Sequence, residues 1–309
     1  MSWKAVTLEI VLTVIVLSFV GYQYHLSTLD GSKHLSQGDI ELVHREYDRA
    51  LVSFARALED IQRSKGAWFF AKGMNIDKRL NSVEALHGMG CAYAGLGKYE
   101  DANDCLTRVL EFNAFYVHSR SKRAEVLCEL GEYEAAVDDF STILQSAPKA
   151  RHTYAQRAGA YVRLEQYDKA IADYAQAMEL ADDGLHDYER MHYANNLAWL
   201  LATCPRRELR DGPRAVEMAE PVVTAAEAKF DPVEGAETLA AFKSTLAFAY
   251  AQAGRYGDAA ATARAALELM DKSGVTDEQK QALRERIEAY EAGRQPQDAE
   301  QKVTQGATE

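Results

Sequence analysis

A spacing of 34 residues recurs through the middle of this 309-residue chain and limits what the chain can fold into. One position of the spacing is always alanine, a second tyrosine and a third leucine: Ala102, Ala136 and Ala170; Tyr99, Tyr133 and Tyr167; Leu96, Leu130 and Leu164. Self-similarity at a period of about 20 to 50 residues marks a repeat architecture, in which each unit buries its apolar face only against its neighbours. The sequence therefore predicts three consecutive repeats, at 83–116, 117–150 and 151–184.

Each repeat has the pattern of two helices joined by a short turn. Early in 83–116, apolar or small residues follow the i, i+3, i+4, i+7 spacing of one helix face: Leu86, Met89, Gly90 and Tyr93. Gly97 then marks the turn, because glycine readily takes the positive φ that ends a helix. Gly131 and Glu165 hold the same slot in the next two copies. Gly90 and Ala102 are small, which predicts that the two helices cross closely.

This pattern resembles the tetratricopeptide repeat, a helical hairpin with the same period. The matching slots of the third copy hold Tyr154, Arg157, Ala158 and Tyr161, and Pro148 closes the second copy. A divergent copy spans 31–64, and another spans 240–273. Between them lies a string similar to a variant found in bacterial members of the family: residues 195–205 followed by Arg210-Asp211-Gly212.

The resemblance implies an all-α fold, a right-handed superhelical solenoid of about six hairpins, to which the sequence adds an N-terminal transmembrane helix. The predicted segments are a membrane anchor (1–26), a divergent first repeat with a basic and aromatic insertion (27–82), three regular repeats (83–184), two further hairpins (185–273), a capping helix (274–293) and a disordered tail (294–309).

The N-terminal segment predicts attachment to a membrane. Residues 5–20 are mostly apolar, and Glu9 is their one charge. Trp3 and Tyr22 lie about 28 Å apart along a helix, close to the thickness of a hydrocarbon core. These two rings and Tyr24 stand where interfacial aromatics lie. We expect a single-pass protein of the cell membrane with the bulk of the chain outside the cytoplasm. A cleaved signal peptide and an amphiphilic soluble helix are the alternatives.

The charge balance narrows the classes of partner. The chain has 47 acidic and 35 basic residues, a formal net charge of -12, which argues against binding to nucleic acid backbones. Four cysteines are too few for a disulfide scaffold of this length. An acidic exterior predicts a preference for basic protein partners and association rates that depend on salt.

Family geometry implies that the first helix of each hairpin lines a groove that receives a segment of another protein. The candidate contacts on these helices are Glu84, His87, Cys91, His118, Glu125, His152, Arg163, Asn195 and Trp199. Some members clamp a C-terminal carboxylate with a Lys/Asn/Arg set. Here His87 and Cys91 stand at the corresponding slots, so that mode of binding is not expected.

His87 and Cys91 lie one helical turn apart, and they suggest an alternative chemistry. With His118, Glu125 and Cys128 from the next hairpin they offer nitrogen, oxygen and sulfur ligands that suit zinc or copper. The simpler interpretation treats them as groove and packing residues, and a disulfide between Cys91 and Cys128 is a further alternative. A third function is that of a self-associating assembly factor.

The motifs predict no enzyme and no cofactor. Gly88 and Gly90 faintly resemble a phosphate loop, but they lie within a helix pattern, with no preceding strand and no G-K-[ST]. None of the eight histidines pairs with a nucleophile at catalytic spacing. Asp138 and Asp139 are interpreted as a solvated helix face, and Cys105 and Cys204 as buried thiols within helices.

An 18-residue insertion, around 63–80, separates the divergent first copy from the regular repeats. It combines five basic residues with three aromatic ones: Arg63, Lys65, Lys72, Lys78 and Arg79; Trp68, Phe69 and Phe70. We interpret it as an elongated helix and loop whose aromatic rings cover the next hairpin. Contact with anionic lipid or with a partner is the alternative.

Overall fold

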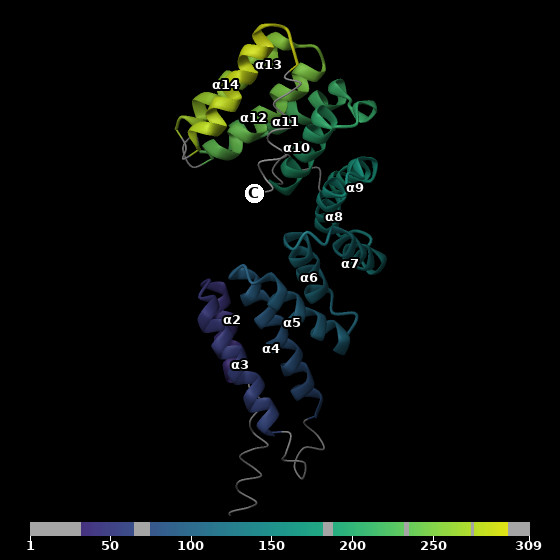
Figure 1. Ribbon diagram of the computed structural model, residues 1–309, viewed down its shortest axis with the longest axis vertical. Helices are drawn as coiled ribbons and strands as arrows, with labels where there is room; N and C mark the ends of the chain where they lie inside the picture. Colours follow the sequence, from purple (N-terminus) through teal and green to yellow (C-terminus); the bar gives the residue numbers. More distant parts are fainter. Residues whose placement is uncertain (1–31, 65–74, 182–187, 232–234, 273–274, 296–309) are drawn as a thin grey trace, which may run out of the picture. The chain divides into compact units, whose positions relative to one another are not determined.

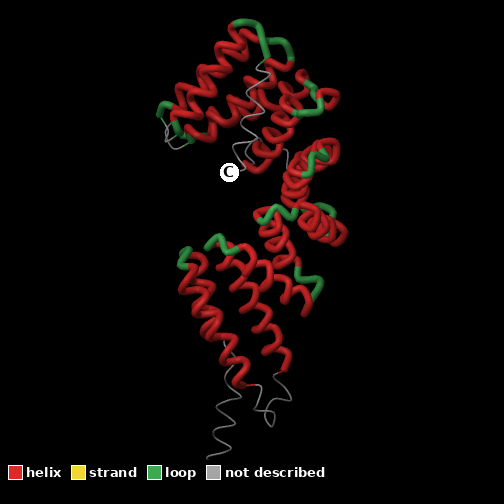
Figure 2. The backbone as a smooth tube through the Cα atoms, in the orientation of Figure 1, coloured by secondary structure: helices red, strands yellow, loops and turns green. Residues whose placement is uncertain are grey.

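The computed structural model describes residues 32–64, 75–181, 188–231, 235–272 and 275–295 (Figure 1). These ranges hold thirteen α-helices, one short 3-10 turn (η2, Arg207–Leu209) and no strand, as Figure 2 shows. The predicted all-helical fold is therefore confirmed for the described part of the chain.

The helices follow one another as six hairpins and a final single helix. The bounds are α2 (Ser32–Val43) and α3 (Tyr47–Ser64); α4 (Asn75–Gly95) and α5 (Tyr99–Phe112); α6 (Val117–Glu129) and α7 (Tyr133–Ser146); α8 (Arg151–Arg163) and α9 (Tyr167–Glu179); α10 (Tyr188–Thr203) and α11 (Gly212–Lys229); α12 (Ala236–Gln252) and α13 (Tyr256–Met270); and α14 (Asp277–Glu291). The chain divides into two compact units, residues 1–139 and 140–309, so α7 begins in the first unit and ends in the second.

A left-handed residue makes the turn within five of the six hairpins. These residues are Arg45 (φ 59°), Gly97 (71°), Gly131 (78°), Glu165 (57°) and Gly254 (78°). In each case a tyrosine begins the next helix two residues later. The glycines carry this backbone without strain, whereas Arg45 and Glu165 adopt it at a cost of about 1 kcal/mol or more each. The geometry of the turn is thus kept even where the sequence departs from glycine.

Small residues let the helices of the first unit approach closely. A Cβ atom added to Gly90 of α4 would stand 2.7 Å from the Cγ of Leu106 on α5. The fully buried ring of Phe54 on α3 fills the space beside two other glycines. Added Cβ atoms at Gly38 of α2 and Gly88 of α4 would lie 2.7 and 2.3 Å from that ring. Larger residues at these glycines would therefore force the helices apart.

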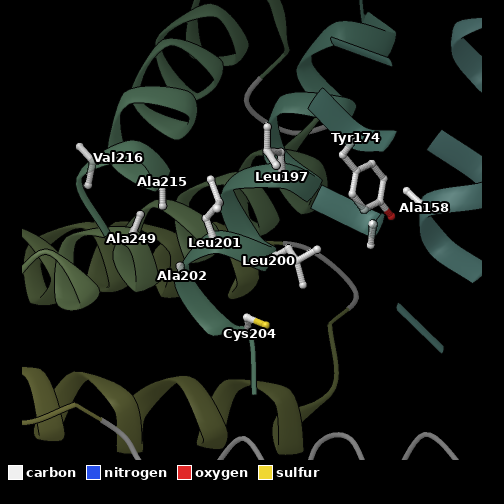
Figure 3. Packing of buried hydrophobic residues seen from close by; sticks show 11 residues of the cluster. Ala158, Tyr174, Leu197, Leu200, Leu201, Ala202, Cys204, Ala215, Val216 and Ala249 are labelled. Atoms are coloured by element: carbon white, nitrogen blue, oxygen red, sulfur yellow. The ribbon is translucent and has the colours of Figure 1, made fainter. Parts of the chain in front are cut away.

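The core of the second unit gathers around α10, as Figure 3 shows. Leu197, Leu200 and Leu201 of that helix are buried, with Tyr174 from α9 and Ala249 from α12 beside them. The longer connection that follows α10 ends in the motif Arg210-Asp211-Gly212.

Two residues of that motif fix where α11 begins. The side chain of Asp211 accepts a hydrogen bond from the backbone N–H of Arg214 (3.0 Å) and so caps the helix. A Cβ atom on Gly212 would lie 2.5 Å from backbone atoms at the end of α12. Both residue types are therefore dictated by local packing.

The interpretation of Asp139 as a solvated residue is wrong. Its side chain is buried and accepts hydrogen bonds from two guanidinium groups of α6, those of Arg120 (2.7 Å) and Arg123 (2.7 and 2.8 Å). Arg123 also donates to the hydroxyl of Thr107 on α5 (3.2 Å). A helix-face argument missed this pairing because the cations come from another helix.

The same network recurs 34 residues later. Arg157 of α8 donates to the Asp173 carboxylate of α9 at 2.7 and 2.9 Å and to the Ser141 hydroxyl at 2.9 Å. Bidentate pairing of this kind fixes the rotation of one helix against the next. The ion pair is thus part of the repeat.

The segments with the strongest membrane signal lie outside the described residues. These are the expected transmembrane helix at 1–26 and most of the insertion, and the tail from residue 296 onward is also outside. Of the helices that the structure does describe, none combines the length and apolarity that crossing a membrane requires.

Replacing Asp139 with alanine should lower the free energy of unfolding by about 3 kcal/mol, because two largely buried arginines lose their shared anion. The same change at Asp104, an exposed aspartate of α5, should cost less than about 0.5 kcal/mol. Urea denaturation followed by circular dichroism measures both. Equal effects for the two variants would contradict the structural role of the pair.

Candidate functional site

In the first unit, several predicted contacts lie on the first helices of the hairpins. His87 of α4 shares a hydrogen bond with the Ser119 hydroxyl of α6 through its Nδ1 atom (2.8 Å). Its Nε2 atom faces the Cys91 sulfur at 3.7 Å, one turn along the same helix. The ring of Tyr116 meets His87 and His118 edge-on, with centroid distances of 5.8 and 6.4 Å. Both ring nitrogens of His87 are therefore engaged within the protein.

Two carboxylates stand on the neighbouring part of this face. Both residues are exposed at the surface. Partial desolvation raises the pKa of Glu84 on α4, and the nearby charge of Asp39 on α2 raises it further. Partial desolvation also raises the pKa of Asp39. Neither forms an ion pair with another residue that the structure describes, and a cation of a partner placed beside them would stabilise their charged form. Asp39 escaped the sequence analysis because it belongs to the divergent first repeat.

Lys122 and Glu125 form an ion pair on α6 (3.0 Å), and Lys122 is close enough to Cys91 to affect its charge state. Burial raises the pKa of the Cys91 thiol, and Lys122 only partly opposes this effect. Burial likewise raises the pKa of Cys128, to about 11. Both thiols are therefore protonated at neutral pH and are poor nucleophiles.

The metal alternative finds no support in this geometry. His87, Cys91, His118 and Cys128 are all described, and no group of three or more such side chains in the described ranges is arranged to hold a metal ion. The proposed disulfide between Cys91 and Cys128 is not formed, since all four cysteines are free thiols. Cys105 is buried within α5, and Cys204 is buried just after α10.

In the second unit, one stripe of α10 combines exposed aromatic rings with unsatisfied polar atoms. Tyr188, His192, Asn195 and Trp199 follow one another at i, i+4, i+7 and i+11. Tyr188 is 48% and Trp199 41% exposed. Between them, His192 Nε2 and Asn195 Oδ1 are buried atoms that no group in the described residues hydrogen-bonds. Asn195 and Trp199, four residues apart, thus lie on the same face of α10.

The stripe is held in place from one end by aromatic contacts. The His192 ring lies edge-on to Tyr188 (4.3 Å between centroids) and to Phe242 of α12 (5.3 Å). Tyr188 also meets Phe230, which follows α11 (5.9 Å). Burial lowers the pKa of His192, which keeps its imidazole neutral at pH 7. Tyr188 and His192 are four residues apart, a spacing that places both rings on the same helix face and could have indicated this cluster from the sequence.

His152 and Arg163 occupy opposite ends of α8, and both are exposed. At 1.5 Å per residue they are about 16 Å apart along the helix. They therefore do not form one cluster, although both remain accessible to a partner.

Sequence comparison agrees with the hairpin geometry. Two models described as tetratricopeptide repeats match residues 87–151 and 152–183. Residues 87–183 are tetratricopeptide repeats. No curated protein gives a significant match to the chain.

Solved structures share the fold of these tetratricopeptide repeats. BtubC from P. vanneervenii is 18% identical, with 74% of this chain and 94% of that one covered and a TM-score of 0.55. A tetratricopeptide repeat protein from Parabacteroides merdae is 17% identical, with 84% and 88% covered and a TM-score of 0.54. A double mutant of MamA from RS-1 is 20% identical, with 65% and 96% covered and a TM-score of 0.50.

His87 should make stability depend on pH. Burial, helped by electrostatic interaction with the nearby His118 and Lys122, lowers the pKa of His87 below the usual 6.5. The unfolded chain therefore takes up this proton more readily. Stability should be unaffected well above pH 6.5 and should fall as the pH drops through 6.5 toward the lowered folded pKa.

The variant His87→Gln should lose this part of the pH dependence. Chemical denaturation at pH 7.5 and 5.5 measures it, and the exposed His152, replaced in the same way, is the control. A difference between pH values that is the same in wild type and His87→Gln would contradict the assignment.

Proposed function

We propose that this protein is a membrane-tethered, non-enzymatic scaffold whose tetratricopeptide repeats bind an extended segment of another protein. Repeats of this kind generally mediate protein–protein interaction. The observation that carries the proposal is the stripe on α10, where buried polar atoms without partners lie beside an exposed tryptophan.

The energetics of this stripe favour an incoming polypeptide. A buried polar atom left without a hydrogen bond costs about 1–3 kcal/mol. A peptide backbone offers both donors and acceptors, which suits the Asn195 oxygen and the neutral His192 ring. Trp199 adds a large apolar surface, and tryptophan is among the residues that dominate binding energy at interfaces. One extended segment lying along α10 would contact all three.

The first unit supplies a charge preference for the same function. Asp39 and Glu84 have raised pKa values and no described cationic partner, so a lysine or arginine of a protein bound to this unit would relieve their repulsion. His118 and Glu125 lie on α6 and remain the other candidate contacts of this unit. The net charge of -12 favours basic partners in the same sense. The right-handed superhelix implied by the family resemblance stays a prediction.

Replacing Asn195 and Trp199 together with alanine should reduce partner capture at least tenfold, because one change removes a hydrogen-bonding amide and the other removes the apolar anchor. Proximity crosslinking in the native cell, followed by mass spectrometry, identifies the partner of the wild-type chain. Pull-down of that partner then compares the variants. Glu217→Ala, on the exposed side of α11, is the matched control. Unchanged capture by the double variant would overturn this assignment of the face.

Membrane tethering rests on the apolar segment between Trp3 and Tyr22. The full chain should sediment with the membrane fraction and should resist extraction with alkaline carbonate. A chain that begins at residue 27 should be released. N-terminal sequencing of the sedimented protein distinguishes an anchor from a cleaved signal peptide, because only the anchor keeps residues 1–26.

A further inference from the structure

We propose that the turn between α5 and α6 is a second membrane contact, which rests on the surface of the bilayer through Phe112, Phe115 and Val117. This inference builds on the proposed membrane tether and names a lipid surface as the occupant of an apolar patch. It concerns residues that neither the repeat pattern nor the groove explains.

Three apolar side chains of this turn are open to water. Phe115 is 88% exposed, Phe112 63% and Val117 41%. Single exposed apolar residues are common on protein surfaces and need no explanation. Two exposed phenylalanines and a valine within six consecutive residues form a patch, and such patches mark contact with a partner or a membrane.

The turn holds Phe115 at its tip. The backbone N–H of Tyr116 donates to the carbonyl oxygen of Asn113 (3.0 Å), which closes a four-residue turn. The Asn113 side chain also accepts a hydrogen bond from the backbone N–H of Phe115 (3.0 Å). The ring is therefore presented on an ordered support, and little further ordering is needed when it inserts into a surface.

The next repeat shows that the fold does not require this apolar character. One period later, the slots of Phe112, Phe115 and Val117 hold Ser146, Lys149 and Arg151. The turn there is closed by the same hydrogen bond, from the Ala150 N–H to the Ala147 carbonyl oxygen (3.0 Å). Polar and charged residues thus support an equivalent turn. The turn itself does not need Phe112 and Phe115, which indicates that these side chains bind something outside the hairpin.

The position of the turn within the first unit points to lipid. Successive helices from α2 to α6 pack against one another and alternate in direction, so α2, α4 and α6 begin at the end where α3 and α5 finish. The predicted anchor ends at residue 26 and α2 begins at Ser32, a separation of about 20 Å at most when fully extended. The anchor therefore keeps this end of the unit close to the bilayer.

The charge of the adjoining sequence fits an anionic surface. Residues 63–80, which connect the end of α3 to the first turns of α4, contain five basic residues and one acidic residue, Asp77. The whole chain, by contrast, carries a formal net charge of -12. Basic residues near an anionic leaflet each contribute about 1 kcal/mol of attraction. This local reversal of charge in the sequence favours an anionic surface over a basic protein partner.

Site-specific photocrosslinking of the full chain tests the proposal. The photoreactive variant Phe115→p-benzoylphenylalanine is reconstituted into vesicles of phosphatidylglycerol and phosphatidylcholine in equal parts. The matched control carries the same probe at Val43, which is also strongly exposed (81%) but lies at the opposite end of α2. Sedimentation first establishes that both chains are on the vesicles, and intact mass spectrometry then measures lipid adducts.

We expect at least tenfold more lipid adduct at position 115 than at position 43. A second probe at the exposed Ala114 should lose most of its lipid adducts when Phe112→Ser and Phe115→Ser are added, because the rings hold the turn on the surface. Circular dichroism confirms that this variant is folded, as Ser146 in the equivalent slot of the next repeat suggests.

Three outcomes would overturn the proposal, and they are distinguishable. Vesicle-bound chains with equal adducts at 115 and 43 would exclude the lipid contact while leaving the tether intact. A covalent dimer formed from position 115 would assign the patch to a second copy of the chain. If the full chain fails to sediment with vesicles, the tether itself is wrong, and the second membrane contact is wrong with it.

Discussion

Close approach of successive helices is the constraint on which the rest of this structure depends. The second helix of every hairpin has an alanine near its beginning that is completely buried: Ala50, Ala102, Ala136, Ala170, Ala215 and Ala259. Where the approach is closest even a methyl group is excluded, as at Gly90 against Leu106 and at Gly88 against the ring of Phe54. Interiors packed at this density tolerate added volume poorly. The repeated small residues thus set the spacing at which every other side chain must fit.

The buried ion pairs act within that spacing. Arg123 with Asp139, and Arg157 with Asp173, join helices at equivalent places one period apart, each with a hydroxyl group as a further acceptor. Such pairs add little net stability over apolar residues, but removal of one partner leaves a buried charge. The main effect of these ion pairs is therefore to fix the orientation of neighbouring helices. Because the interior residues orient the helices, we expect the surface residues that differ between repeats to recognise a binding partner.

Those variable positions include the main residues proposed here to contact a protein partner or the membrane surface. Asn195 and Trp199 lie on a hairpin that departs from the regular repeat, and Asp39 belongs to the divergent first one. Phe115 stands where the next repeat has Lys149. In repeat proteins the shared residues build the scaffold, so a residue that breaks the pattern without affecting the turn or the core is available for binding.

The sequence by itself determined the hairpins, their period and their turns, because these follow from local spacing and from the backbone preferences of glycine and alanine. It also placed Asn195 and Trp199 on one helix face. Only the tertiary structure decided which charges are buried. The sequence pattern indicated that Asp139 is solvated, but in the structure it accepts hydrogen bonds from two arginines of α6. The sequence also made His87 a candidate metal ligand, but its two ring nitrogens contact Ser119 and Cys91. Sequence spacing does not determine which side chains of different helices come into contact. Those contacts decide whether a polar group is buried and which hydrogen bonds it forms.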